Sequence, residues 1–366
     1  MSQMNLTIPV YEILKAFNLS EEITDIKPHG NGHINDTLLV HTKDSHTSFI
    51  LQKINTSIFQ QPDRLMENIQ KVTGWIHEKV VSEGGDSRRE VLHVIPTADQ
   101  KTYLRTADHS YYRLYQFIDG VCLDLPRNET DFYESGVAFG KFQGYLSDFP
   151  VNELHDTIPD FHNTGKRFEN LLKAIDADAA GRAADAADEI DFALSRKASV
   201  EDVMEAKKSL PIRVTHNDTK LNNVMLDPVT GKALCVLDLD TVMAGYAMDD
   251  FGDSIRFGAS SALEDEADLS RVWMKLDLFA AFAKGFLSAS KDKLTPEEIR
   301  LFPLGARMMT YECGIRFLTD YLQGDVYFKV AYPQHNLVRA RNQFALVRDM
   351  EQKMEAMQQI ILNEIK

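Results

Sequence analysis

Residues 214–226 read VTHNDTKLNNVML and are followed, at 233–240, by ALCVLDLD. This pattern predicts two short strands around a polar loop, and then a third strand that ends in a carboxylate pair, Asp238 and Asp240. The loop contains His216, Asp218 and, five residues after that aspartate, Asn223. His-x-Asp alone recurs by chance and usually belongs to a solvated turn. The full succession of strand, His-x-Asp, Asn, strand, turn, strand and Asp indicates a functional site.

Phosphoryl transfer from ATP requires this combination of groups. One carboxylate must accept the proton of the attacking hydroxyl, and Asp218 is the candidate for this general base. An amide oxygen and a second carboxylate must hold Mg²⁺, because hard cations prefer oxygen ligands. The kinase catalytic loop places these roles on an Asp and on the Asn five residues later. Asn223, and Asp238 from the next strand, are therefore the predicted magnesium ligands.

Composition limits the possible partners. A chain of 366 residues is long enough to build two lobes with ample cores. The net charge of −15 argues against a nucleic-acid or anionic-membrane partner, which would favour a basic face. The three cysteines are far apart and show no metal-binding or redox spacing. The first ten residues lack the features of a signal peptide, and no apolar run approaches the length of a membrane span, so we expect a cytoplasmic protein.

Residues 1–118 are predicted to form an antiparallel sheet and a nucleotide-binding lobe. Gly30, Asn31 and Gly32 lie in the turn between the first two strands. Here the glycines would let backbone N–H groups approach a phosphate; an ordinary hairpin is the alternative. Gln116 and Ile118 belong to a hinge whose backbone could pair with adenine. The predicted strands are 23–28, 37–40, 48–54, 91–95, 101–105 and 111–118, with helices at 8–18 and 64–78.

The third predicted strand, 48–54, leaves one assignment open. Kinase-like folds place a lysine that binds the phosphates on this strand. Alignment of the hydrophobic run puts Gln52 at that position and Lys53 one residue beyond, where the side chain would point to the other face. Either residue could contact the phosphates. Glu67 in the following helix is a candidate partner of the lysine, or simply a solvated residue.

Residues 119–366 are predicted to be mainly helical and to form a catalytic and substrate-binding lobe. Thr295 begins one helix with a capping box, and that helix is expected to continue to about Leu322. The other predicted helices are 132–149, two or three within 168–210, 268–288 and 336–365.

The chain resembles the aminoglycoside phosphotransferase/choline kinase superfamily and, within it, the N-acetylhexosamine 1-kinases. The resemblance implies an α+β, bilobal protein-kinase-like fold, with a small antiparallel lobe and a larger helical lobe. It implies transfer of the ATP γ-phosphoryl group to the anomeric hydroxyl of N-acetylglucosamine or N-acetylgalactosamine. It also implies that Asp240 assists Asn223 and Asp238 if two magnesium ions bind. The segments that carry the resemblance are 32–35, 55–59, 213–223, 250–260, 312–314, 316–318, 320–322 and 335–339.

The resemblance further implies a sugar site made of His33, Phe257, Arg316 and Tyr327 beside Asp218. Each of the four has an alternative: a surface turn residue, a core aromatic ring, an internal ion pair and a packed tyrosine, respectively. We expect a monomer whose partner is a small-molecule sugar. Two other hypotheses remain: a kinase for choline, homoserine or an aminoglycoside, and a catalytically inactive, kinase-like binding protein. Gln52 supports the inactive protein, and the intact set of Asp218, Asn223 and Asp238 argues against it.

Overall fold

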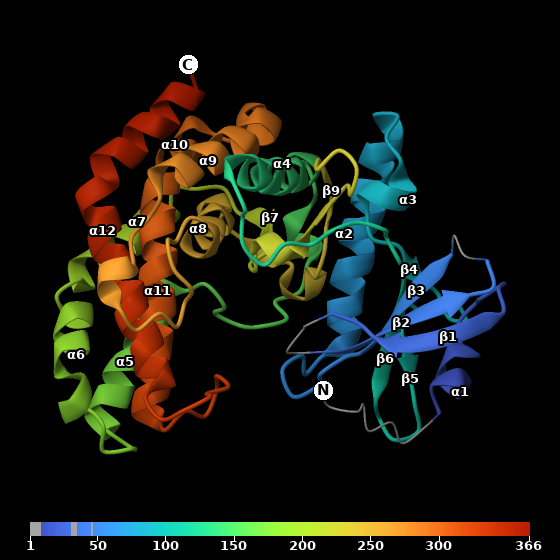
Figure 1. The fold of residues 1–366 in the computed structure, drawn as a ribbon, viewed down its shortest axis with the longest axis horizontal. Coiled ribbons are helices and arrows are strands. Elements are labelled where there is room, and N and C mark those ends of the chain that lie inside the picture. Colours follow the sequence, from blue (N-terminus) through green and yellow to red (C-terminus); the bar gives the residue numbers. More distant parts are fainter. Residues whose placement is uncertain (1–8, 31–34, 45–46) are drawn as a thin grey trace.

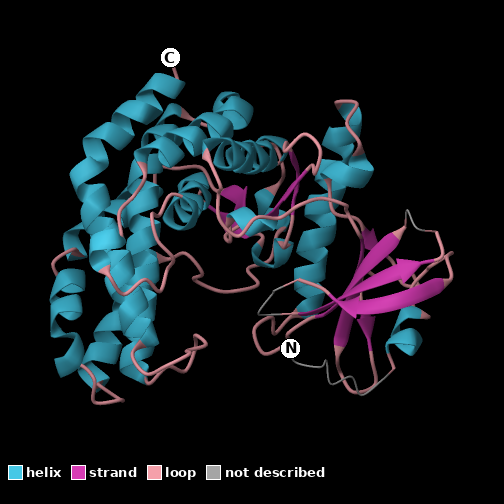
Figure 2. Cartoon of the chain, in the orientation of Figure 1, coloured by secondary structure: helices cyan, strands magenta, loops and turns pink. Residues whose placement is uncertain are grey.

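The computed structural model describes residues 9–30, 35–44 and 47–366, and the chain is divided between a small sheet and a larger helical part (Figure 1). Within the described residues, the sheet has six antiparallel strands, hydrogen-bonded in the order β1-β2-β3-β6-β4, with β5 paired to β6. This division confirms the predicted α+β class (Figure 2). The strands of the sheet are β1 (Ile23–Pro28), β2 (Asp36–Thr42), β3 (Ser48–Lys53), β4 (Val94–Ile95), β5 (Leu104–Arg105) and β6 (Tyr111–Gln116).

The two faces of the sheet pack on different helices. Side chains alternate between the faces of a strand, so Leu51 of β3 packs with α1 (Val10–Leu14) while Ile50 faces the cluster under α2 (Pro62–Ser82). The short helix α3 (Ser87–Glu90) lies between α2 and β4. Beyond β6, Val121 pairs with Leu226, and this bridge ties the connecting segment to the larger part.

The larger part is built from helices around an aromatic core. Phe251 of α8 (Ala247–Gly258) stacks on Phe302 of α11 (Phe302–Gln323) with ring centroids 4.4 Å apart, and Phe282 and Phe286 of α9 (Leu276–Ser290) pack edge-on against Phe251. The helices are α4 (Glu129–Tyr145), α5 (Thr164–Ala177), α6 (Ala187–Leu194), α7 (Lys197–Lys207), α8 (Ala247–Gly258), α9 (Leu276–Ser290), α10 (Pro296–Arg300), α11 (Phe302–Gln323) and α12 (His335–Glu364). None of the helices in the described residues is long and apolar enough to cross a membrane.

Two expectations for this part are corrected. The helix predicted over 295–322 is divided at Leu301 into α10 and α11, because Pro303 lacks an N–H and its ring would clash with the preceding turn of a continuous helix. The capping box at Thr295 is present as predicted. The helix predicted to begin at 268 begins at Leu276, after a short 3₁₀ turn. Helix α8 was not predicted.

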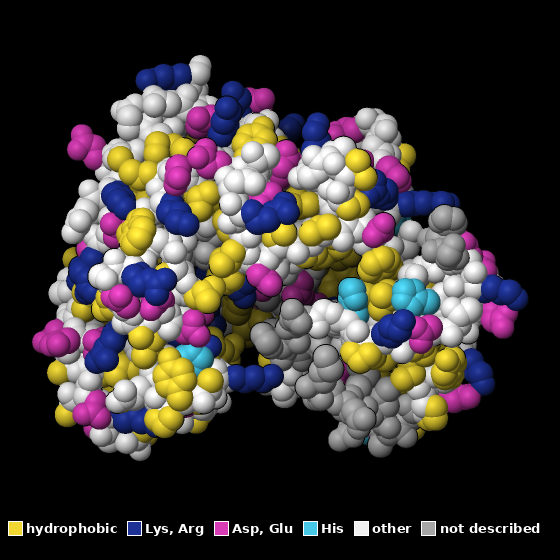
Figure 3. All heavy atoms as spheres, in the orientation of Figure 1, with side chains coloured by type: hydrophobic (Ala, Val, Ile, Leu, Met, Phe, Trp, Pro, Cys, Tyr) yellow, Lys and Arg dark blue, Asp and Glu magenta, His cyan; other side chains and the backbone are white. Residues whose placement is uncertain are grey.

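Four short strands position the catalytic loop within the helical part. β7 (Arg213–Thr215) pairs with β10 (Met243–Gly245), and β8 (Val224–Leu226) pairs with β9 (Ala233–Val236). The loop between β7 and β8 therefore lies beside the end of β9, as the sequence pattern requires. The surface of the molecule is hollowed between the two parts (Figure 3).

Candidate active site

Asp218 lies in the loop between β7 and β8 and has two close polar neighbours. Lys220 Nζ is 2.8 Å from Asp218 Oδ1. The side-chain amide of Asn223 donates to the main-chain oxygen of Asp218 at 2.8 Å and to its Oδ2 at 3.3 Å. The charge of Asp218 raises the pKa of Lys220, so the ammonium stays protonated beside the carboxylate. Lys220 was not singled out in the sequence, although it stands two residues after the predicted base.

Asp238 follows β9 in a left-handed backbone conformation, with φ of 53°. Its carboxylate accepts no hydrogen bond and forms no ion pair within the described residues, and the residue is partly open to solvent. Partial desolvation by the surrounding protein and the negative charges of Asp240 and Asp218 raise the pKa of Asp238 to about 7. Such an unpaired carboxylate, beside the free Oδ1 of Asn223, fits a magnesium ion, which takes oxygen ligands and would relieve the repulsion.

Asp240 lies in a different setting. Its Oδ1 is paired with Arg113 Nη1 at 2.5 Å, and its Oδ2 accepts a hydrogen bond from Asn35 Nδ2 at 2.6 Å. Both oxygens thus already have donors from the smaller part. The side chains of Asn223 and Asp238, which lack such engagement of their oxygens, fit the metal better than Asp240 does.

Helix α8 holds the catalytic loop by its backbone. The carboxylate of Asp250 accepts hydrogen bonds from the N–H groups of His216 and Asn217, both at 2.8 Å. Asp253 accepts from the N–H of Thr219 at 3.0 Å. Three amides around the candidate base are therefore fixed by two buried carboxylates that lie 33 to 34 residues later in the chain.

His162 clamps the same loop from another side. Its Nδ1 is 3.0 Å from Glu312 Oε1 and its Nε2 is 3.0 Å from the main-chain oxygen of Asn217. Both nitrogens face acceptors, so the ring carries both protons and a positive charge. Burial opposes both charges, but the hydrogen bond and the opposite charge of each partner prevail. They raise the pKa of His162 and hold the pKa of Glu312 at about 2.

Only some of the residues predicted to contact the nucleotide lie within the described part of the chain. Gly30 has φ of 74°, a conformation that favours glycine, at the end of β1. Asn31, Gly32 and His33 lie outside the described residues. The N–H of Gln116 donates to the oxygen of His93, whereas that of Ile118 has no acceptor within the described chain. Ile118 packs with Met225 and Cys235 in a small apolar cluster that could flank an adenine ring.

Gln52, and not Lys53, faces the candidate site. Gln52 Oε1 accepts a hydrogen bond from Arg113 Nε at 3.0 Å, while Lys53 Nζ lies on the other face of the sheet, 6.0 Å from the centre of the Tyr112 ring. Glu67 forms ion pairs with Lys71 and His155 instead of with Lys53. The sequence left the choice between residues 52 and 53 open, because the register of strand pairing decides it.

Arg316 and Tyr327 lie together at a cavity of about 340 Å³. The guanidinium carbon of Arg316 is 5.8, 6.0 and 5.5 Å from the ring centres of Phe161, Tyr327 and Phe328, and Arg316 has no ion pair or hydrogen bond within the described residues. Phe257 does not line this cavity; its ring lies beside Arg256 at the end of α8. The lining residues are Arg167, Asn170, Lys173, Arg316, Thr319, Asp320, Gln323, Tyr327 and Phe328.

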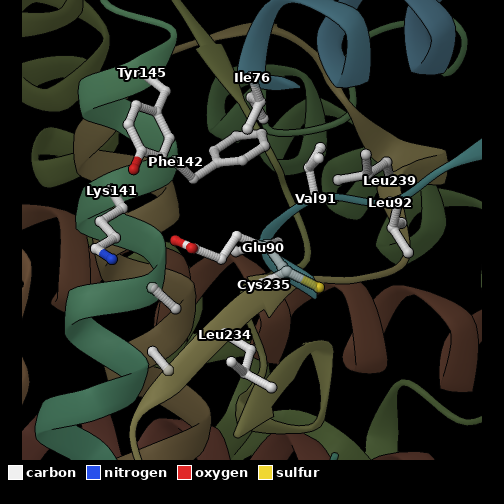
Figure 4. Close-up of a pocket in the computed structure, with 13 residues that line it drawn as sticks. Ile76, Glu90, Val91, Leu92, Lys141, Phe142, Tyr145, Leu234, Cys235 and Leu239 are labelled. Carbon is white, nitrogen blue, oxygen red and sulfur yellow. The ribbon is translucent and has the colours of Figure 1, made fainter. Parts of the chain in front are cut away.

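A second, much smaller cavity of about 30 Å³ lies between α3, α4 and β9. Figure 4 shows Glu90 reaching from α3 toward α4, which carries Lys141 and Tyr145. Its size suits little more than a water molecule, and Asp218 and Asp238 are not among its lining residues. It is therefore not the site of the reaction.

Comparisons with known proteins agree with this architecture. Residues 25–282 match the phosphotransferase enzyme family, abbreviated APH. The chain is similar to spectinomycin phosphotransferase solved with ADP and spectinomycin (13% identity, 95% of this chain and 100% of the other, TM-score 0.58). It is also similar to choline kinase from Cryptosporidium parvum Iowa II (16% identity, 96% and 97%, TM-score 0.54). Ethanolamine kinase of Plasmodium vivax is a third similar structure (15% identity, 87% and 81%, TM-score 0.55).

At these identities the solved structures show a shared fold, and the family match covers well over half of the chain, including Asp218, Asn223 and Asp238. The chain belongs to the phosphotransferase enzyme family.

Proposed function

We propose that this chain is an ATP-dependent kinase that phosphorylates the anomeric hydroxyl of N-acetylglucosamine or N-acetylgalactosamine, giving the sugar 1-phosphate. The observation that carries the phosphoryl-transfer part is the grouping of Asp218, Lys220 and Asn223 on one loop beside the carboxylate of Asp238, which has no partner among the described residues. ATP would lie between a lobe of residues 1–118 and a lobe of residues 119–366. The similar structure of spectinomycin phosphotransferase, solved with ADP and spectinomycin, supports this class of reaction.

Each residue has a role in the proposed reaction. Asp218 accepts the proton of the attacking hydroxyl and orients that hydroxyl toward the γ-phosphoryl group. Lys220 holds the carboxylate of Asp218 in place through their ion pair. Asn223 and Asp238 would hold magnesium, which when bound neutralises phosphate charge. The N–H of Ile118 would donate a hydrogen bond to the edge of the adenine, and the backbone of Gly30 would approach the phosphates.

The charge of the cavity at Arg316 supports a neutral, hydroxyl-rich acceptor. Its basic side chains are Arg167, Lys173 and Arg316. The acidic lining residue, Asp320, already accepts the backbone N–H groups of residues 326–328 and the amide of Asn336. A choline or aminoglycoside cation would be repelled, and Arg316 already occupies the position between aromatic rings that a quaternary ammonium would take.

An acceptor screen tests the proposal. Purified protein is incubated with ATP and magnesium and with N-acetylglucosamine, N-acetylgalactosamine, glucose, choline, homoserine or an aminoglycoside, and ADP release is followed. We expect turnover of the two N-acetylhexosamines, and a ³¹P signal coupled to the anomeric proton of the product. A 6-phosphate product, or brisk turnover of choline without either sugar, would overturn the sugar 1-kinase assignment. Binding of ATP without turnover of any acceptor would favour the inactive binding protein.

A further inference from the structure

A buried arginine interrupts the apolar strand β6. The side chain of Arg113 is 1% exposed, and its partner Asp240 is 5% exposed. Arg113 Nη1 pairs with Asp240, Nε donates to Gln52 Oε1 at 3.0 Å, and the guanidinium lies against the ring of Tyr115. A charge this deeply buried is costly unless each of its groups is engaged, so the arrangement requires a specific reason.

Arg113 stands where the charge pair of a protein kinase would otherwise be. Protein kinases use a lysine on the third strand paired with a glutamate of the following helix. Here β3 carries Gln52, directly opposite Arg113 in the strand register, and α2 presents the sulfur of Met66 at 3.9 Å from Arg113 Nη1. The positive charge has moved by one strand, and its carboxylate partner comes from the larger part of the molecule.

Asp240 is held from two sides by the smaller part. Asn35 donates to its second oxygen at 2.6 Å, and the Oδ1 of Asn35 in turn accepts the N–H of Asn55 at 2.9 Å. Asp240 lies two residues after Asp238, in the 3₁₀ turn Leu239–Thr241. Asp238 has a left-handed φ, a backbone conformation that is less favourable than the right-handed one for a residue with a Cβ atom. Fixing Asp240 therefore fixes the backbone that aims the Asp238 carboxylate.

We propose that Arg113 is the positioning residue of the magnesium site: through Asp240 it holds Asp238 in place, and it replaces the third-strand lysine in this task. Asp240 is accordingly a tether between the two parts of the molecule and not a metal ligand. This inference rests on the proposed use of Mg–ATP, but it is independent of the identity of the acceptor.

The first test is nucleotide binding, measured by calorimetry with ATP alone and with ATP plus magnesium. Wild-type protein should bind ATP more tightly when magnesium is present. Arg113→Met should keep the affinity for ATP alone. It should reduce the gain in ATP affinity that magnesium provides by roughly 10- to 100-fold, the usual effect of changing a residue behind a metal ligand. An equal loss with and without magnesium would overturn the proposal, because it would mean direct contact with the phosphates. Unchanged binding in both conditions would also overturn it.

A second variant distinguishes positioning from general damage. Gln52→Lys added to Arg113→Met puts an ammonium on the neighbouring strand, within reach of Asp240, and should recover about tenfold of the lost magnesium-dependent affinity. Lys53→Met is the matched control. It removes a charge from β3, the strand of Gln52, but on the opposite face of the sheet, and it should behave as wild type. Absence of any recovery in the double variant contradicts the proposal.

If Arg113→Met does not fold, Arg113→Met combined with Asp240→Asn removes the unpaired buried charge and carries the same measurement. If the wild type binds Mg–ATP but uses no N-acetylhexosamine, the proposed acceptor is wrong while the role of Arg113 is still decided by the binding data.

Discussion

At the scale of single residues, the proposed acid–base chemistry depends on Asp218. Asp218→Asn preserves the size of the side chain and removes its ability to accept a proton. We expect kcat to fall by about two to four orders of magnitude, the usual contribution of a general base, while ATP and sugar still bind. Steady-state kinetics with nucleotide titrations would show this. A variant with wild-type kcat would mean that another group takes the proton.

Asp238 is expected to make the magnesium requirement depend on pH. Because its pKa in the metal-free protein is raised to about 7, magnesium must displace a proton below that pH and should bind more weakly there. Magnesium titrations between pH 6 and pH 8, followed by thermal stability, would measure this. Asp238→Ala should be inactive at every magnesium concentration, whereas Asn223→Ala should recover in part at high magnesium. Magnesium affinity that does not change over this range would contradict the assignment.

The pair of His162 and Glu312 should make the stability of the catalytic loop depend on pH at both ends. Glu312 has a lowered pKa, so its stabilisation is present above its usual value of 4.5 and is lost as the pH falls toward about 2. His162 has a raised pKa, so its stabilisation is complete below 6.5 and is lost as the pH rises through the folded value. The two shifts describe one shared interaction, which should be fully formed between about pH 4.5 and pH 6.5.

Glu312→Gln tests this pair. It leaves His162 without its counter-charge and should cost about 3–5 kcal/mol in the free energy of unfolding, the typical result of breaking a buried ion pair. Urea unfolding of the variant and wild type at pH 6 would measure the difference, and the loss should become smaller at a second pH above the folded pKa of His162, where the wild-type pair itself is weakened. An equal loss at both pH values would show that the imidazole does not titrate as described.

At the scale of elements, close helix packing sets the frame of the larger part. A Cβ atom at Gly140 of α4 would collide with the main-chain oxygen of Phe286 in α9. Gly140→Ala should therefore force the helices apart and cost roughly 1–3 kcal/mol. Gly74→Ala in α2 is the control, because a Cβ there meets nothing within 4 Å; it should be neutral or stabilise by up to about 1 kcal/mol. Equal effects of the two substitutions in thermal unfolding would contradict this account of the α4–α9 contact.

Helix α8 shows how an element can be both core and support. Its apolar side, with Phe251 and Ile255, is fully buried. Its polar side is also buried and points Asp250 and Asp253 at the backbone of the catalytic loop. Met248, Phe251 and Ile255 keep helical spacing, but nothing in the sequence shows that the acidic side of the helix is buried as well.

At the scale of the whole molecule, the proposed acceptor cavity and the proposed nucleotide site belong to different surfaces. Arg316 and Tyr327 line a cavity of the helical part, whereas Gln52, Arg113 and Asp240 lie where the sheet meets that part. Substitutions in the cavity should therefore affect only the sugar, and substitutions at the second place should affect only ATP. Arg316→Ala should weaken sugar use by about 1.5–3 kcal/mol, the value of one charge-assisted hydrogen bond, and leave the KM for ATP almost unchanged. Kinetics with each substrate varied in turn would measure both KM values. A rise in the KM for ATP would refute the separation.

Much of the fold was predictable because its signals are local. The strands at 23–28 and 111–116, the capping box at Thr295 and the last long helix follow from alternation, side-chain capping and helical periodicity, which neighbouring residues decide. The division of the helix at Leu301 was also present in the chain, in Pro303, but it was outweighed by the apolar pattern on both sides.

The sequence by itself determined the family and the order of the candidate catalytic groups, because Asp218 and Asn223 lie at a fixed spacing in one loop and Asp238 follows the next strand but one. Only the tertiary structure decided which charges meet. Register placed Gln52, and not Lys53, opposite Arg113, and long-range packing joined Arg113 to Asp240 across 127 residues and His162 to Glu312 across 150. The physical reason is that the partner of a buried charge is selected by proximity in space, for which the spacing of residues along the chain provides no rule.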